Sequence, residues 1–298
     1  MDHDLATGSP DPRPVVVVGY DETARAQRAL RWAAGEAAHD GGTLRVVVAW
    51  EPEDGAGWAQ ALGRSGPRWA AAAAQGAAAV VRAEHPGVQV VELPVAGDAA
   101  ELLPANAKDA DLLVVGTRGH VGVVGAVLGS VSRRCLREAT VPVVLLGPDA
   151  PDLREVRVVI TRWHGEAGGA AQEWGVRRAV GRHLPLHLLD SWHLQPGAPE
   201  LSVERRRALQ LTAAQDAHER ALVDLRVAVG GQVEVTGDLV EGRGIDVEYA
   251  RTHRGDLLVV DRDDEDHRPS VRHSRCPIVV VPPPSGQSAP RVGGRVLS

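Results

Sequence analysis

The chain of 298 residues repeats itself, so its fold must be one that each half of the sequence can build. Like residues recur at nearly constant spacings: Trp32/Trp174 and Trp50/Trp192 at 142 residues, Gly97/Gly242 and Asp111/Asp256 at 145, and Pro142/Pro277 at 135. The fall from 145 to 135 means that the second half lacks ten residues. They are missing from the glycine-rich segment GTRGHVGVVGAVLGSVSRR, residues 116–134 of the first half. Since the second half folds without this segment, we expect it to form a site.

Short β-branched runs alternate with longer helical stretches in both halves. The runs are PVVVVGYD, TLRVVVAW, VQVVELPV, DLLVVG and VPVVLL in the first half, and VRVVIT, LPLHLLDSW, QVEVTGDLV, DLLVVD and CPIVVV in the second. Strands that are apolar at consecutive positions and separated by helices indicate a parallel sheet covered on both faces. We therefore expect an α/β fold with two tandem, doubly wound, five-stranded sheets. The predicted organisation is a disordered arm at 1–13, domains at 14–148 and 154–282, and a flexible tail at 283–298.

Composition narrows the classes of partner. The net charge of -6 and a pI near 6.1 give no broad basic surface for a nucleic-acid backbone. No apolar run is long enough to span a bilayer, and the acidic start lacks the apolar core of a signal peptide. Cys135 and Cys276 have no metal-binding spacing and fit a reducing compartment better than a disulfide. We expect a cytoplasmic protein that binds no nucleic acid.

The glycine segment follows the run DLLVVG and so leaves the sheet at its carboxyl edge, where open α/β folds bind ligands. Glycines there let a ligand approach the backbone, and a helix start supplies free N–H groups, which suits phosphate. The segment does not end in GK[ST], as a Walker loop does, and it does not follow the first strand, as a dinucleotide fingerprint does. The alternative is a flexible glycine-rich turn without a ligand.

Gly116, Gly119, Gly129 and Ser130 reproduce the spacing G-x2-G-x9-G-S, and VVVVGYDET places Asp21 just after the first strand. In these features nearly the whole chain resembles the universal stress protein family, as two tandem copies. The resemblance implies a flavodoxin-like, adenine nucleotide alpha hydrolase-like fold with strand order 3-2-1-4-5, and ATP as the ligand, with or without Mg2+. It also implies these contacts: Asp21 to the base or ribose, Ala49 along the adenine pocket, Val115 and Gly116 behind the ribose and phosphates, and Arg118, Gly119, Gly129, Ser130 and Val131 around the triphosphate.

The second half differs at the matching positions. Trp163 stands at the place of Asp21, and DRDDEDHRPSVRHSR replaces the glycine segment. Five acidic residues from Asp261 to Asp266 would repel a triphosphate. We expect a degenerate copy that binds no ATP and that either stabilises the first copy or offers a regulatory surface.

Two clusters of possible metal ligands also lie in the second half: the acidic residues Asp261, Asp263, Asp264 and Asp266, and the histidines His183, His187 and His193. The acidic cluster lacks the central glycine and distal glutamate of an EF-hand loop, which favours a solvated acidic loop. Pro185 prevents the histidines from sharing a helical face, which favours structural histidines.

The sequence supports binding more than chemistry, since it has no G-x-S-x-G elbow and we expect both cysteines to be packing residues. Trp50 is a candidate neighbour of the adenine. We expect a regulator of the bacterial stress or dormancy response that acts through its nucleotide-dependent conformation and a regulatory protein partner. Two alternatives stay open: a slow ATPase or autophosphorylating enzyme, modified on Ser130 or Ser132, and a nucleotide-independent scaffold. In the scaffold the fifth strands pair at the sheet edge, within the chain and between chains of a homodimer.

Overall fold

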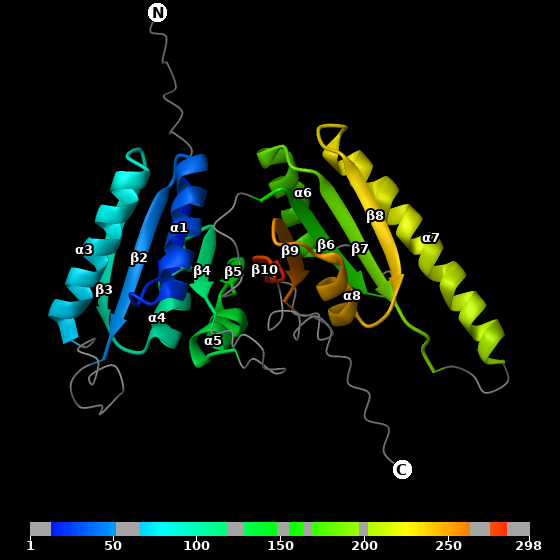
Figure 1. Ribbon diagram of the computed structural model, residues 1–298, viewed down its shortest axis with the longest axis horizontal. Helices are drawn as coiled ribbons and strands as arrows, with labels where there is room; N and C mark the ends of the chain where they lie inside the picture. Colours follow the sequence, from blue (N-terminus) through cyan, green and yellow to red (C-terminus); the bar gives the residue numbers. More distant parts are fainter. Residues whose placement is uncertain are drawn as a thin grey trace, which may run out of the picture.

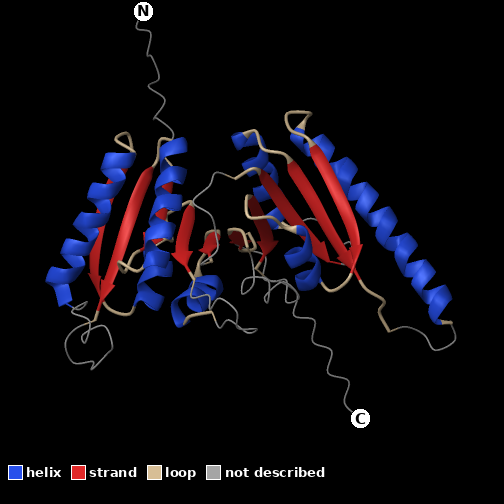
Figure 2. Cartoon of the chain, in the orientation of Figure 1, coloured by secondary structure: helices blue, strands red, loops and turns tan. Residues whose placement is uncertain are grey.

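The computed structural model of the chain describes residues 13–51, 66–117, 128–147, 155–163, 169–196, 202–262 and 275–284. Strands and helices alternate along these residues, as the sequence predicts (Figures 1 and 2). The first half contains β1 (Val15–Gly19), α1 (Ala24–His39), β2 (Thr43–Trp50), α3 (Gly66–Glu84), β3 (Gln89–Ala96), α4 (Ala99–Asn106), β4 (Leu112–Gly116), α5 (Ser130–Glu138) and β5 (Val143–Leu146). The second half contains β6 (Arg157–Trp163), α6 (Ala170–Arg182), β7 (Leu186–Trp192), α7 (Val203–Val229), β8 (Val235–Glu241), α8 (Gly244–Arg251), β9 (Asp256–Asp261) and β10 (Ile278–Val281).

All the strands belong to one sheet, in the order β3-β2-β1-β4-β5-β10-β9-β6-β7-β8. The first five strands have the expected order 3-2-1-4-5, and every pairing within a half is parallel. The two sheets are not separate, however. The last strands of the halves, β5 and β10, pair antiparallel at the centre of the molecule and join the halves edge to edge (Figure 1). The two expected five-stranded sheets are therefore continuous, because each apolar edge strand finds the other as its partner, as the scaffold alternative predicts.

Strand pairing in the second half repeats that of the first at the spacings found in the sequence. The corresponding pairs are Val16–Leu44 and Val158–Leu186, Val16–Leu112 and Val158–Leu257, Leu44–Val90 and Leu186–Val235, and Leu113–Val143 and Leu258–Ile278. Each residue of a first-half pair lies 142, 145 or 135 positions before its counterpart in the second half, and these are the spacings of the repeated Trp, Gly, Asp and Pro residues. The internal repeat is therefore a repeat of structure as well as of sequence.

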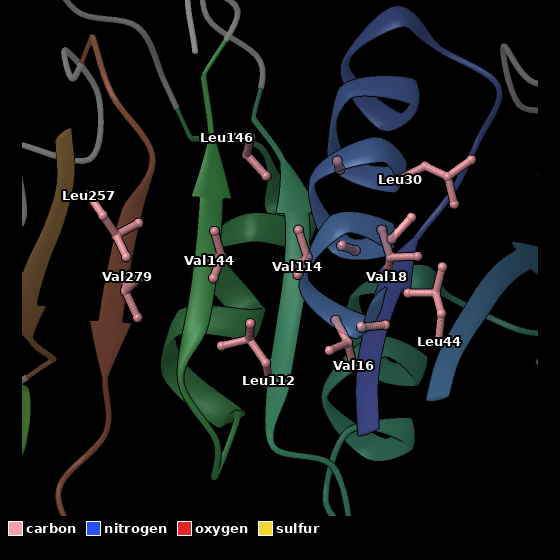
Figure 3. Packing of buried hydrophobic residues seen from close by; sticks show 14 of the residues in the cluster. Val16, Val18, Leu30, Leu44, Leu112, Val114, Val144, Leu146, Leu257 and Val279 are labelled. Atoms are coloured by element: carbon pink, nitrogen blue, oxygen red, sulfur yellow. The ribbon is translucent and has the colours of Figure 1, made fainter. Parts of the chain in front are cut away.

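Each face of the sheet has its own apolar core, because consecutive strand residues point to opposite faces. Val16, Val18 and Val144 share one face with α1, α3, α6 and α7. Val17 and Val143 share the other face with α4, α5 and α8. Both cores continue from one half into the other across the β5–β10 pair, and Figure 3 shows this for the core that contains Val144 and Val279. The halves thus share both hydrophobic cores, whose burial is the main stabilising contribution to the fold.

Small residues and caps explain the local structure of the helices. The buried faces of α1 and α3 consist largely of alanine, which lets these helices approach the sheet closely. Thr23 caps α1 by accepting a hydrogen bond from the Ala26 amide, and α7 ends at Gly230 in the left-handed region with φ 57°. Among the described helices, none has the length and apolar character needed to cross a membrane.

Candidate functional site

The candidate site lies at the carboxyl edge of the first-half strands. The helix after β1 covers one face of the sheet and the helix after β4 covers the other, so the chain diverges between these adjacent strands. This is the topological switch point at which open α/β sheets bind their ligands. The fold therefore brings three segments to one edge: the turn after Gly19, the end of β2 at Trp50, and the end of β4 at Gly116.

Helix α5 begins at this edge without a capping side chain among the described residues. Its N-cap is Gly129, with φ -59° and ψ 160°, and the Gly129 carbonyl accepts a hydrogen bond from the Arg133 amide over 3.0 Å. The first-turn amides, including those of Ser130 and Val131, have no intrahelical acceptor and carry the positive end of the helix dipole. Ser130 is exposed and adds a hydroxyl. The arrangement suits an anion that accepts several hydrogen bonds.

Asp21 lies in the turn between β1 and α1. One carboxylate oxygen accepts hydrogen bonds from the amide of Thr23, over 3.1 Å, and from its hydroxyl, and the other lies 3.3 Å from the Arg25 guanidinium. The Asp21 side chain remains 41% exposed. Because each carboxylate oxygen has two lone pairs, Asp21 can organise this turn and still accept a hydrogen bond from a ligand hydroxyl.

The same turn contains a feature that the sequence analysis missed. Glu22 has a positive φ of 59°, a left-handed conformation that is unfavourable for a side chain of this size. Its carboxylate accepts a hydrogen bond of 2.7 Å from the indole of Trp69 on α3, which fixes the residue in this conformation. No local sequence pattern indicates this contact, since the two residues are 47 positions apart.

The packing of α1 against β4 also requires glycine at position 116. A Cβ atom at this position would lie 2.7 Å from the backbone oxygen of Arg25, so the first turn of α1 can pack here only against glycine. Val115 is buried in the apolar core on the α4 and α5 face, and only its backbone remains for contact with a ligand. Ala49 is half-buried near the end of β2, where it pairs with Val95. Gly116 is thus required by the packing of α1 whether or not a ligand binds.

Of the predicted binding residues, Asp21, Ala49, Val115, Gly116, Gly129, Ser130 and Val131 belong to elements that meet at this edge. Arg118 and Gly119 lie outside the described residues. The described part of the glycine motif is therefore its two ends, one at the end of β4 and the other at the start of α5.

The corresponding edge of the second half is filled by side chains of that half. Asp190, near the end of β7, is 2% exposed and accepts hydrogen bonds of 3.0 and 2.7 Å from Arg162 of β6. His218 of α7 places its Nδ1 atom 2.7 Å from the same carboxylate. Burial by itself would raise the pKa of Asp190, but the bonds from His218 and Arg162 outweigh it and lower the pKa. The sequence analysis missed this ion network, because its members lie on separate elements.

The prediction of a solvated acidic loop is wrong for its first residue, Asp261. It ends β9 at the position that matches Gly116, and its carboxylate accepts a hydrogen bond of 2.8 Å from the Ala171 amide at the start of α6. It is therefore a capping residue rather than part of a solvated loop. Asp263, Asp264 and Asp266 lie outside the described residues.

The three histidines lie in separate structural settings. His183 follows α6 with φ 54°, His187 lies with its Nδ1 atom 2.9 Å from the Thr236 hydroxyl, and His193 lies 2.8 Å from Gln195. Within the described ranges, no three His, Cys, Asp or Glu side chains form a group able to hold a metal ion.

Both cysteines are buried and unbonded to each other, which confirms their prediction as packing residues. Burial raises the pKa of the Cys135 thiol to about 12, so it is a poor nucleophile in the folded protein.

Comparison with known proteins gives a family for the first half of the chain. Residues 13–147 match the model of the universal stress protein family. The universal stress protein Rv2623 of Mycobacterium tuberculosis (strain ATCC 25618 / H37Rv) is 30% identical over 152 residues, which cover 48% of this chain and 48% of that protein. The chain thus spans about half the length of the curated relatives it matches.

Solved structures extend the likeness of fold to both halves. A universal stress protein from Archaeoglobus fulgidus DSM 4304 matches 93% of this chain and 98% of its own, with a TM-score of 0.60 at 15% identity. Another from Archaeoglobus fulgidus, solved in complex with dAMP, is 26% identical with a TM-score of 0.33, and the match covers 44% of this chain and 95% of that one.

Proposed function

We propose that the first half of this chain, in which residues 13–147 match the model of the universal stress protein family, binds an adenine nucleotide and that the second half does not. The observation that supports this most strongly is the start of α5. Gly129, a glycine of the motif, is the N-cap residue of α5, and no described side-chain oxygen accepts a capping hydrogen bond from this helix. The helix begins at the edge of the sheet where α/β folds bind ligands.

The phosphates are assigned to α5. Amides of the first helical turn would donate to phosphate oxygens, and the Ser130 hydroxyl would add a further charge-assisted hydrogen bond. Arg118 and Gly119 complete the motif in sequence and belong to the same proposed phosphate site. If Mg2+ participates, it would enter with the phosphates, since Mg2+ sites in proteins are commonly completed by substrate phosphates.

The nucleoside is assigned to the turn after β1 and the end of β2. Asp21 is partly exposed and can accept a hydrogen bond from a ribose hydroxyl or a base amine. Ala49 and Trp50 are half-buried at the end of the neighbouring strand and offer apolar surface for the base. Together these assignments predict ATP, which combines the three chemical parts.

The second half gives a contrast that supports the proposal. At its corresponding edge, Asp261 occupies the start of α6 with a carboxylate, and Arg162 and Asp190 form a buried ion pair. A nucleotide phosphate at this edge would meet the Asp261 carboxylate, which stands where the first half has Gly116. We therefore assign one nucleotide to each chain.

The proposed role is that of a cytoplasmic regulator in a stress or dormancy response. Its nucleotide state would be passed to a protein partner through conformation. Turnover is assigned a minor part at most, because the Asp21 carboxylate in the turn after β1 is already engaged by Thr23 and Arg25.

The test is isothermal titration of nucleotide-stripped protein with ATP, with and without Mg2+, on the wild type and on Gly129→Asp. Aspartate suits the backbone of this N-cap and would cap α5, so the variant should fold at least as stably as the wild type. Its carboxylate would occupy the phosphate position and repel the ligand. Gly129→Asn is the matched control, because it caps the helix without a charge.

We expect one site per chain in the wild type, weaker binding in Gly129→Asn and no binding in Gly129→Asp. Unchanged affinity in Gly129→Asp would contradict the phosphate assignment. Absence of binding to the stripped wild type would favour the scaffold function instead, for which the β5–β10 pairing is the supporting observation.

A further inference from the structure

The two halves are related by an approximate two-fold axis through the β5–β10 pair. Val144 pairs with Val279, and these residues are 135 positions apart, the spacing of the repeat in this region. On either side, Leu145 pairs with Ile278 and Val143 with Val280. Figure 3 shows Val144 and Val279 on these two neighbouring strands. A residue that meets its own counterpart marks a two-fold axis, as in an isologous dimer.

Helices α1 and α6 meet next to this axis, since α1 contacts β5 and α6 contacts β10. Glu36 of α1 and Arg178 of α6 are 142 positions apart, so they are counterparts in the repeat. The Arg178 guanidinium donates to the Glu36 carboxylate through its Nη1 and Nη2 atoms, the latter over 2.7 Å. The Arg178 and Glu36 side chains are only 8% and 9% exposed. At this buried position the repeat has exchanged an acid for a base.

The exchange occurs a second time, one helical turn further on. Asp40 and Arg182 are also 142 positions apart, and they form an ion pair of 3.2 Å. Arg182 in addition lies 2.7 Å from Glu36. We call Glu36, Asp40, Arg178 and Arg182 the axis cluster. Within these four residues the acids belong to the first half and the bases to the second. Arg178 also binds Glu155 of its own half over 2.8 Å, so the second half has two arginines and one acid at this surface.

The apolar surroundings of the axis cluster are the same from both sides. The Arg178 guanidinium lies 5.8 Å from the ring centre of Trp32 and 5.8 Å from that of Trp174, which are themselves counterparts. The paired strands are also alike, VVLL in β5 and IVVV in β10. Neither the tryptophans nor the strands can therefore distinguish one half from the other at this interface.

We propose that the charges of the axis cluster select the partner of each half, so that the first half pairs with the second and neither pairs with a copy of itself. Two first halves would bring Glu36 and Asp40 against the same carboxylates, and two second halves would bring arginine against arginine. Like charges that meet in a buried interface are strongly unfavourable and exclude a partner that otherwise fits. The partner of this surface is the other half of the chain, and any homodimer must use a different surface.

The test uses charge reversals in the full chain, which give the axis cluster charges of one sign. Glu36→Arg with Asp40→Arg makes the axis cluster all basic, and Arg178→Glu with Arg182→Glu makes it all acidic. The combination of all four substitutions restores opposite charges in exchanged places. All variants also contain Glu155→Gln, because Glu155 is a second carboxylate bound to Arg178 and would repel a glutamate there.

Neutral variants separate repulsion from loss of attraction. Glu36→Gln with Asp40→Asn, and Arg178→Gln with Arg182→Gln, remove one side of the cluster without reversing it. Unfolding by urea, followed by circular dichroism, gives the midpoint for each variant. We expect each reversed variant to unfold at a lower urea concentration than its neutral counterpart, and the fourfold variant to recover most of the loss.

If the reversed variants do not fold, the fourfold variant still decides the question, because folding of that variant alone supports selection by charge. The proposal is overturned if reversed and neutral variants unfold at the same midpoint, or if the fourfold variant is no more stable than the less stable reversed variant.

Discussion

Removal of the Asp190 charge should destabilise the protein more than almost any other single change in the second half. Asp190 is 2% exposed and accepts two hydrogen bonds from Arg162, whose side chain is only 8% exposed, while His218 lies 2.7 Å away. Opposite charges about 4 Å apart attract by about 4 kcal/mol at an effective dielectric constant of about 20. Loss of one partner from a buried ion pair costs about 3–5 kcal/mol, because the other charge stays buried without compensation.

We therefore expect Asp190→Asn to lower the free energy of unfolding by about 3–5 kcal/mol, as measured by urea denaturation with an unchanged m value. Asp190→Leu combined with Arg162→Leu should cost much less than the sum of the single changes, because no buried charge is left. Asp109→Asn is the matched control. Its pair with Arg45 is also bidentate, through Nη1 and Nη2, but Asp109 lies at the surface, so stability should not change measurably.

The pH dependence gives an independent check on Asp190. Its pKa is lowered in the folded state, so the unfolded chain takes up the proton first on acidification. The stabilisation is therefore complete above the unfolded pKa of about 3.9 and is lost as the pH falls through the folded pKa. Asp190→Asn should flatten this acid limb. A loss below about 1 kcal/mol at pH 7, or fully additive leucine substitutions, would refute the reasoning that the network is a buried, coupled ion pair.

Three further predictions concern single side chains. Gly116→Ala should destabilise the first half by about 1–3 kcal/mol, since the added Cβ meets the Arg25 backbone oxygen; unfolding at the wild-type urea midpoint would show that α1 is free to shift. Cys135 should resist thiol reagents at pH 8 in the folded protein and react after unfolding, because burial raises its pKa to about 12; rapid labelling under native conditions would contradict its placement. Burial, and secondarily Arg157, lower the pKa of His187, so stability should fall as the pH drops below about 6.5, and His187→Gln should remove this contribution; an unaltered slope would exclude it.

The sequence was sufficient for the parallel strands and for the alignment of the two halves, and the family resemblance gave the strand order 3-2-1-4-5. Consecutive apolar residues identify buried parallel strands, and the spacings of repeated tryptophans, glycines and prolines align the halves residue by residue. The spacing of 142 residues also points to the ion pair between Glu36 and Arg178, which the sequence analysis did not predict. Four residues beyond the Trp32–Trp174 pair, it places Glu36 at the position of Arg178, and the opposite charges of these counterparts are visible in the sequence.

Other features depend on contacts between distant elements. Arg162, Asp190 and His218 lie 28 residues apart on β6, β7 and α7, and no local pattern marks three such residues as a unit. The reason for Gly116 is likewise tertiary, since the glycine fits both a phosphate site and close packing of α1. In the candidate site the sequence indicated which segments meet. It could not indicate that the Asp21 carboxylate is shared with Thr23.

Hydrogen–deuterium exchange of the stripped full chain, with and without ATP, tests the central claim most directly because it locates the ligand. The account predicts slower exchange at residues 129–132 and 115–117, where α5 begins and β4 ends. It predicts unchanged exchange at residues 260–262, which match 115–117, and at residues 169–172, where α6 begins. Protection of the second-half residues, or none at the start of α5, would contradict the assignment of one nucleotide to the first half.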